Sequence, residues 1–233
     1  MTHDALRARL YDWKHEGFLR RQLRDVEFFA HWARQTDGPI LELGCGTGRV
    51  TADLAERGHD VVGLDRDSAM LDRARRRVDA LGAEAQHRVR FVEGDMREFD
   101  LDGPFPLVCI PYNTFQCLRT LEAQRQCLRT IRRHLTAEGR LCLQLTPFQL
   151  VDDPSDWEHR VTDRLDEEGT VVAMYERIRQ DDPAQLTHFD QRFQLFRPDG
   201  TVETVEDSLT VRTIFRFECR LLLEQCGFEL TDL

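Results

Sequence analysis

The chain has 233 residues, of which 41% are hydrophobic and 32% are charged, and its formal net charge is −10. This balance is typical of a globular protein and argues against disorder, and at about 150 residues per domain it fits one large domain or one domain with an insertion. The excess of acidic residues disfavours general nucleic-acid binding, because a surface that neutralises phosphates is rich in Lys and Arg. No stretch approaches the roughly 18 apolar residues of a membrane span, so we expect no membrane partner.

The cysteines and the first residues bear on the cellular compartment. The seven cysteines are an odd number without a Cys-x-x-Cys pair, and most of them stand among apolar residues. They are typical of reduced thiols in a core, and they do not form a metal or redox motif. Charged residues occur within residues 1–4, where a secretory signal needs an apolar core. We therefore expect a cytoplasmic protein without a bound metal.

Helix and strand patterns alternate over the first two-thirds of the chain. Apolar residues at helical spacing, bounded by capping and stop signals, predict helices over residues 19–34, 49–58, 68–82 and 120–135. Short apolar runs between them predict strands over 40–43, 60–65, 89–93, 106–111 and 141–145. Ser68 is the expected cap of its helix. Strands separated by helices imply an α/β fold with a doubly wound, mostly parallel sheet.

The pattern changes in the last third of the chain. Over residues 161–211 the apolar positions mostly alternate with polar ones, and turn signals interrupt them at 182–183 and 198–200. The alternation includes Val171, Ala173 and Tyr175. This predicts an antiparallel β meander inserted after the fifth strand, followed by a helix over 214–225 and a short strand over 228–230.

These patterns divide the chain into three parts. Residues 1–147 form the expected α/β core, which carries the binding site. Residues 148–212 form the meander, as a lid or a dimer surface, and residues 213–233 return to the core as a helix and a strand. The edges of an antiparallel sheet invite pairing with another chain, so a homodimer is one expectation.

A glycine-rich loop, Gly44-Cys45-Gly46-Thr47-Gly48, joins the first strand to the next helix. Glycines let the backbone turn tightly and pass close to a ligand, and the helix N-terminus offers free N–H groups to an anion. A dinucleotide loop needs Gly-x-Gly-x-x-Gly, whereas Arg49 occupies the position of the last glycine here. This departure disfavours an NAD(P)-linked oxidoreductase.

Three segments at successive strand ends carry a family resemblance: Leu41–Gly48, Gly63–Asp65 and Gly94–Met96. With these motifs the chain, from about Tyr11 to Pro147, resembles the class I S-adenosylmethionine-dependent methyltransferases. The resemblance implies a Rossmann-like fold, S-adenosylmethionine as the cofactor, and transfer of its methyl group by in-line displacement.

The resemblance also implies roles for individual residues. The glycine loop passes the amino-acid moiety and the sulfur of the cofactor, and Glu42 orders the loop or takes the ammonium group indirectly. Asp65 accepts hydrogen bonds from both ribose hydroxyls, Asp95 accepts one from the adenine amino group, and Met96 covers the ring. Tyr11 matches a tyrosine that closes over the cofactor in some members. The expected cofactor-binding residues are Tyr11, Glu42, Gly44, Cys45, Gly46, Gly48, Asp65, Arg66, Met70, Asp95, Met96 and Ile110.

The methyl acceptor is expected over the end of the fourth strand, at Ile110–Asn113. Enzymes that methylate amino groups of DNA carry Asn-Pro-Pro-Tyr or a close variant there. Only Pro111 and Tyr112 agree, which leaves no side chain to hold an exocyclic amine. The chain is more similar to small-molecule methyltransferases, including amino-sugar and glycine or sarcosine N-methyltransferases, so we expect transfer to nitrogen or oxygen of a small acceptor. The catalytic candidates are Tyr112 and His188, the latter as a base because imidazole titrates near neutral pH.

Other classes of function stay open on the sequence alone. The same fold can hold the cofactor as a sensor or regulatory subunit without transferring methyl, which a sealed acceptor pocket would indicate. Methylation of a protein or an RNA predicts a broad groove over Tyr112 in place of a lidded cavity.

Overall fold

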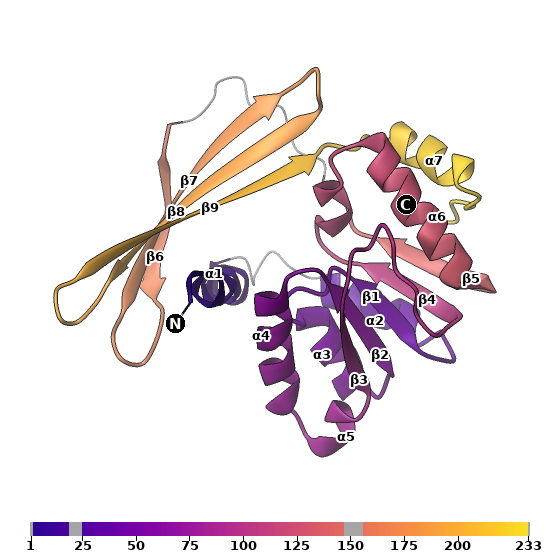
Figure 1. Ribbon diagram of the computed structural model, residues 1–233, viewed down its shortest axis with the longest axis horizontal. Helices are drawn as coiled ribbons and strands as arrows, with labels where there is room; N and C mark the ends of the chain where they lie inside the picture. Colours follow the sequence, from indigo (N-terminus) through magenta and orange to yellow (C-terminus); the bar gives the residue numbers. More distant parts are fainter. Residues whose placement is uncertain (1, 19–24, 147–155, 233) are drawn as a thin grey trace.

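The computed structural model describes residues 2–18, 25–146 and 156–232, which form two sheets (Figure 1). Five strands form a parallel sheet in the order β3-β2-β1-β4-β5, and four form a separate antiparallel sheet in the order β6-β7-β8-β9. The predicted α/β fold with a meander after the fifth strand is therefore confirmed. The predicted last strand is wrong, because residues 228–230 follow the last helix without strand structure.

The parallel sheet positions the site. Its strands are β1 (Ile40–Leu43), β2 (Val61–Asp65), β3 (Val89–Glu93), β4 (Phe105–Ile110) and β5 (Leu135–Leu143). The chain builds this sheet outward from β1, first to β2 and β3 on one side and then to β4 and β5 on the other. The strand order reverses between β1 and β4, and doubly wound sheets bind ligands at the carboxyl ends of the strands beside such a point.

Helices cover both faces of the parallel sheet. They are α2 (Asp25–Ala33), α3 (Arg49–Glu56), α4 (Ser68–Asp79), α5 (Ala83–Gln86), α6 (Leu121–His134) and α7 (Arg216–Gln225), with a 3-10 turn η2 (Thr114–Cys117). Successive side chains of a strand point to opposite faces. Leu41 and Val108 accordingly pack with residues of α6 and α7, whereas Ile40 and Leu107 pack with residues of α2 and α3. Burial on both faces explains the continuous apolar runs of these strands.

The first helix belongs with the antiparallel sheet in space. That sheet consists of β6 (Glu158–Arg164), β7 (Val171–Asp181), β8 (Leu186–Phe196) and β9 (Val202–Arg212), and α1 (His3–Asp12) lies between it and the parallel sheet (Figure 1). Leu6 and Leu10 of α1 form a buried cluster with residues that include Met174 and Phe193. A π-helical turn, η1 (Trp13–Phe18), continues α1 toward the glycine loop.

The buried face of β7 differs from the expected one. The alternation of Val171, Ala173 and Tyr175 is present, but the residues that pack under α1 are Val172 and Met174 on the opposite face. Both faces of β7 carry apolar side chains, so the alternation does not by itself identify the covered side.

The N-terminus of α4 also differs from the expectation. Asp67 is the N-cap in place of Ser68, and its carboxylate accepts hydrogen bonds from the backbone N–H of Ala69 at 2.9 Å and of Met70 at 3.3 Å. A carboxylate at this position satisfies free N–H groups and complements the helix dipole. The helix ends at Asp79, before the predicted stop at Gly82. Of the helix predicted over 19–34, the part after residue 24 is confirmed as α2, and residues 19–24 lie outside the described residues.

All seven cysteines are free. Cys45, Cys109, Cys127 and Cys142 are buried as expected, whereas Cys117 is exposed. In the described part of the chain, no helix has the length and apolarity needed to cross a membrane, and no group of three or more His, Cys, Asp or Glu residues is arranged to hold a metal ion.

Candidate active site

The loop between β1 and α3 depends on glycine. Gly44, Gly46 and Gly48 have φ angles of 66°, 55° and 76°, a region that residues with a Cβ rarely adopt. A Cβ on Gly44 would also lie 2.1 Å from Cγ2 of Thr114. At Gly46 the space that a Cβ would take has no atom within 4 Å. The loop therefore presents its backbone to open space at Gly46, where a ligand can approach closely.

Asp65, the last residue of β2, stabilises the conformation of this loop through hydrogen bonds. Its Oδ2 accepts a hydrogen bond from the backbone N–H of Gly46 at 2.8 Å, and its Oδ1 accepts one from the N–H of Asp67 at 2.9 Å. Burial raises the pKa of the Asp65 carboxyl, and these hydrogen bonds oppose the rise. Each carboxylate oxygen offers more than one lone pair, so both oxygens of Asp65 can still accept hydrogen bonds from ligand hydroxyls.

Glu42 lies in β1 beside the loop and is only 2% exposed. Its carboxylate accepts a hydrogen bond from the hydroxyl of Thr51 and forms no ion pair within the described ranges. Burial raises the pKa of Glu42 to about 7. The charge of Arg49 opposes this rise in pKa, but Arg49 pairs directly with Asp25 and not with Glu42. A positively charged ligand group beside this buried acid is therefore favoured.

A pocket lies between the glycine loop, the residues after β4 and the end of α1. Five of the expected residues line it: Tyr11, Glu42, Gly44, Cys45 and Tyr112. The structure thus brings together residues from the N-terminal helix, the first strand and the end of the fourth strand, at the point where the strand order reverses.

Three rings form one wall of this pocket. The rings of Tyr11 and His15 stack with 3.8 Å between centroids, and Tyr112 meets His15 edge-on at 5.4 Å. Tyr112 has a φ of 55°, and its backbone N–H donates to Oε1 of Gln144 at 2.7 Å. A positive φ in a bulky residue is strained and is typical of functional sites. Burial raises the pKa of both tyrosines.

His15, which was not among the residues expected from the sequence, is 4% exposed and lines the pocket. Its Nδ1 lies 2.8 Å from the backbone oxygen of Tyr11. A carbonyl oxygen only accepts hydrogen bonds, so Nδ1 carries the proton and Nε2 has a free lone pair. Nε2 is buried and has no hydrogen-bond partner in the described part of the chain. The sequence signal for His15 is its position four residues after Tyr11, which puts the two on one helical face.

The two arginines that line the pocket form ion pairs with acidic residues of the protein. Asp12 of α1 pairs with Arg77 of α4 at 3.1 Å, which ties α1 to the parallel-sheet layer. Arg49 binds Asp25 of α2 through two hydrogen bonds of 2.8 and 2.6 Å. Asp25 and Asp12 thus neutralise the charges of Arg49 and Arg77. Among the acidic residues that line the pocket, Glu42 is the one that forms no ion pair with a described residue.

The residues expected around the adenine follow β2 and β3, outside the pocket lining. The Asp95 carboxylate is held by the Arg97 guanidinium at 2.6 and 3.0 Å, and this contact lowers the pKa of Asp95. Met96 is partly buried against the core. The side chain of Ile110 is fully buried in the core, so only its backbone can face a ligand. The remaining two, Arg66 and Met70, stand before and in the first turn of α4.

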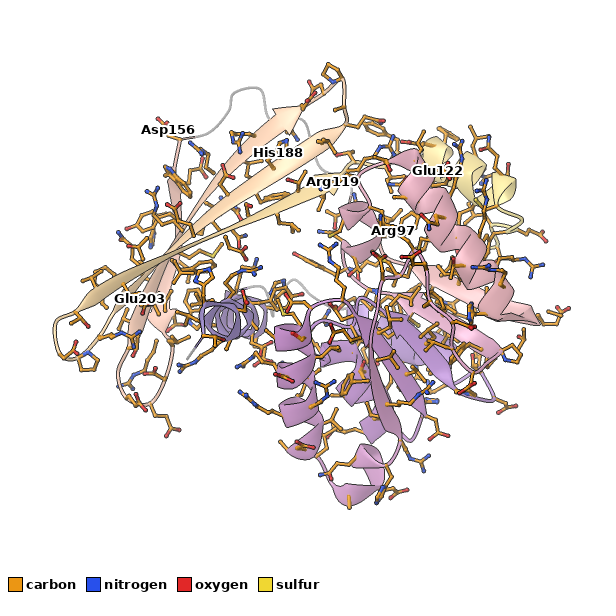
Figure 2. The ribbon with its side chains drawn as sticks, in the orientation of Figure 1. Arg97, Arg119, Glu122, Asp156, His188 and Glu203 are labelled. Carbon is orange, nitrogen blue, oxygen red and sulfur yellow. The ribbon has the colours of Figure 1, made fainter. Side chains whose placement is uncertain are left out.

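His188 lies on the meander (Figure 2). Its Nδ1 is 2.9 Å from Oγ1 of Thr210 on the neighbouring strand. Side chains alternate along β8, so His188 faces away from the side on which Phe193 packs under α1. The structure therefore does not bring His188 together with Tyr112 at the pocket.

Residues 40–139 match the family model of a methyltransferase domain. The matched span contains the glycine loop, Asp65 and Asp95, which are the positions that carry the resemblance in the sequence. Over these residues the chain is a methyltransferase domain of the class I fold, which uses S-adenosylmethionine.

Curated relatives of this methyltransferase include two bacterial proteins. The putative methyltransferase YqeM of Bacillus subtilis (strain 168) is 26% identical over 195 residues, which are 83% of this chain and 74% of that protein. The cypemycin N-terminal methyltransferase of a Streptomyces species is 35% identical over 127 residues, which are 54% of this chain and 46% of that protein. The match thus spans less than half of the second relative.

Solved structures resemble the methyltransferase over most of its length. CalS10, an amino pentose methyltransferase from Micromonospora echinaspora with S-adenosylmethionine bound, has a TM-score of 0.66 and 27% identity, covering 87% of this chain and 80% of that one. The CcbJ methyltransferase from Streptomyces caelestis has a TM-score of 0.72 and 24% identity, covering 90% and 81%. The second likeness shows the fold alone.

Proposed function

We propose that this methyltransferase acts on the nitrogen of a small-molecule amine, with the oxygen of a hydroxyl group as the second acceptor class. The observation that carries the proposal is the pocket, which lies at the reversal of strand order and has α1 and η1 as one wall. A peptide or RNA would need a broader groove over Tyr112. Two relatives, an amino pentose methyltransferase and an N-terminal methyltransferase by name, support nitrogen as the acceptor atom.

The residues present fit S-adenosylmethionine. Gly46 faces open space, and the buried acid Glu42 suits the positive end of the cofactor. We assign the ribose hydroxyls to Asp65, and the adenine to Asp95 and Met96. We assign the other expected residues to the same cofactor: Tyr11 as a cover, Gly44, Cys45 and Gly48 as the loop, Arg66 and Met70 beside the adenine, and Ile110 through its backbone.

When bound, S-adenosylmethionine supplies a methyl group that the acceptor's lone pair takes in one displacement, while the electrons of the broken C–S bond stay on sulfur. The protein's part is to orient the acceptor and to exclude water. The rings of Tyr11, His15 and Tyr112 contact one another and form a rigid wall for this purpose. Because burial raises the pKa of Tyr112, its hydroxyl stays protonated at neutral pH and acts as a hydrogen-bonding group, not as a base.

We also propose a structural role for His188. Its hydrogen bond to Thr210 joins β8 to β9, and it lies on the face of the meander that points away from α1. Replacement of His188 by Phe is therefore expected to leave methyl transfer unchanged, which makes this variant a control for substitutions at the pocket.

A substrate screen tests the proposed function. Release of S-adenosylhomocysteine is measured with amino sugars, glycine, sarcosine, a peptide with a free N-terminus, and hydroxyl compounds matched in size. The expected result is turnover of small amines. Turnover of the peptide or of RNA alone, with none of the small compounds accepted, contradicts the proposal.

Binding of the cofactor is expected to release protons at pH 7. Glu42 has a pKa of about 7 in the ligand-free pocket, so about half of the molecules carry the proton at that pH. A cationic group beside Glu42 lowers its pKa, and about half a proton leaves on binding. The measurement is the calorimetric binding enthalpy in buffers of different ionisation enthalpy. Glu42→Gln should bind without this buffer dependence, and a wild type that shows none contradicts the assignment.

The chain's association state and location are further parts of the proposal. The edge strands β6 and β9 have no outer partner among the described residues, which supports a homodimer built by edge pairing. The free cysteines support a cytoplasmic location. Sedimentation of the pure protein is expected to give twice the chain mass of 27.3 kDa, and a single chain mass at all concentrations contradicts the dimer.

A further inference from the structure

A residue that lines the pocket, His15, carries a buried hydrogen-bond acceptor that no described residue uses. The Nδ1–H of His15 is engaged by the backbone oxygen of Tyr11, which leaves the lone pair of Nε2 without a partner in the described part of the chain. His15 lines the pocket, and its ring lies between Tyr11 and Tyr112. A buried polar atom without a partner is costly and calls for an explanation. A donor brought by a ligand satisfies it.

We propose that Nε2 of His15 accepts a hydrogen bond from an N–H of the amine substrate and so orients the nitrogen's lone pair for attack. This inference rests on the proposed function. It concerns the acceptor subsite, because the ring of His15 contacts that of Tyr112, two residues after the end of β4. The cofactor's ammonium group has its own acid in Glu42 on the β1 side of the pocket.

The groups around His15 keep its Nε2 unprotonated, so this nitrogen can accept a hydrogen bond. It is faced by Lys14 on η1, Arg49 on α3 and Asp25 on α2, and burial together with the two cations lowers its pKa to about 3. The Asp25 charge opposes this but is itself paired with Arg49. Nε2 therefore stays unprotonated at neutral pH. A protonated His15 would donate to the amine and occupy the lone pair that must attack, so the neutral form is the one that suits the reaction.

Nitrogen NMR of the protein labelled at histidine tests the inference without turnover. In the free protein, His15 should show a protonated Nδ1 and an unprotonated Nε2 that does not titrate between about pH 5 and pH 8. In the complex with S-adenosylhomocysteine, methylammonium should shift the Nε2 resonance, while tetramethylammonium, a cation without N–H, should not. Protonation at Nε2, titration in this range, or equal responses to the two cations would overturn the proposal.

Variant kinetics form the second arm. His15→Phe keeps a flat ring against Tyr11 but lacks Nε2, and it is expected to lower kcat/KM for the best amine of the screen by about 10²-fold, the scale of a misplaced reacting atom. Its affinity for S-adenosylhomocysteine should stay within about threefold of wild type, and His188→Phe should match wild type in both measurements. A large loss of S-adenosylhomocysteine affinity assigns Nε2 to the cofactor and refutes the acceptor role, as does unchanged kcat/KM. Failure of the wild type to bind S-adenosylhomocysteine refutes the proposed function, and the NMR of the free protein still reports on His15.

Discussion

Replacement of Asp65 by Ala is expected to remove measurable binding of S-adenosylmethionine. In our assignment the carboxylate accepts hydrogen bonds from both ribose hydroxyls, and a hydrogen bond to a charged group contributes about 1.5–3 kcal/mol. The same carboxylate holds the Gly46 N–H at 2.8 Å, so its loss also releases the loop that faces the ligand. Together these effects predict a fall in affinity of about 10³-fold or more, measured by calorimetry.

Asp60 offers a matched control for this experiment. It precedes the other end of β2, is exposed, and pairs only weakly with Arg88 at 3.2 Å. Asp60→Ala removes the same charge from the residue just before the same strand and should bind S-adenosylmethionine as the wild type does. If Asp65→Ala folds and also binds like the wild type, the assignment of the ribose to Asp65 is wrong.

Replacement of Gly44 by Ala is expected to destabilise the protein strongly. The φ of 66° costs a residue with a Cβ about 1–2 kcal/mol, and the new Cβ would stand 2.1 Å from Cγ2 of Thr114. Relief of that overlap requires η2 or the loop to move, as in overpacked cores, where the cost is about 1–3 kcal/mol. We expect a loss of about 3 kcal/mol in the free energy of unfolding, measured by urea denaturation without ligand.

Two further variants separate the cost of the positive φ from the cost of the overlap with Thr114. Gly46→Ala has a similar φ of 55° but meets no atom within 4 Å, so it should show the backbone cost alone. Thr114→Ser removes Cγ2, and in the Gly44→Ala background it should restore most of the difference between the two alanine variants. Equal stability of Gly44→Ala and Gly46→Ala would show that Thr114 does not restrict the loop.

The parallel sheet could be predicted from the sequence because its strands are buried by helices on both faces. Each strand is then a short apolar run that a turn or cap bounds, and residues 89–93 are predicted with the bounds that the structure has. The choice between Ser68 and Asp67 as a cap could not be made this way, since both side chains can accept from free N–H groups. The strand predicted over 228–230 fails because apolar residues there pack on the core without joining the sheet.

The parts of the candidate site that local sequence determines could be predicted. The parts that depend on how α1 packs between the two sheets could not. The glycine loop and Asp65 follow directly from strand ends, and the structure joins them through one hydrogen bond. Which histidine meets the pocket depends on how α1 lies between the two sheets, and that contact is made by residues such as Leu6 and Phe193, far apart in the chain. The strand alternation of β8 turns His188 away, while the helical turn after Tyr11 turns His15 inward.

The most direct test of the account is a crystal structure of the protein with S-adenosylhomocysteine. We predict the ribose hydroxyls on Asp65, the amino-acid end of the ligand between the glycine loop and Glu42, and the sulfur facing the wall of Tyr11, His15 and Tyr112. A ligand bound elsewhere, or one whose sulfur points away from this wall, would contradict the proposal that methyl transfer takes place in this pocket.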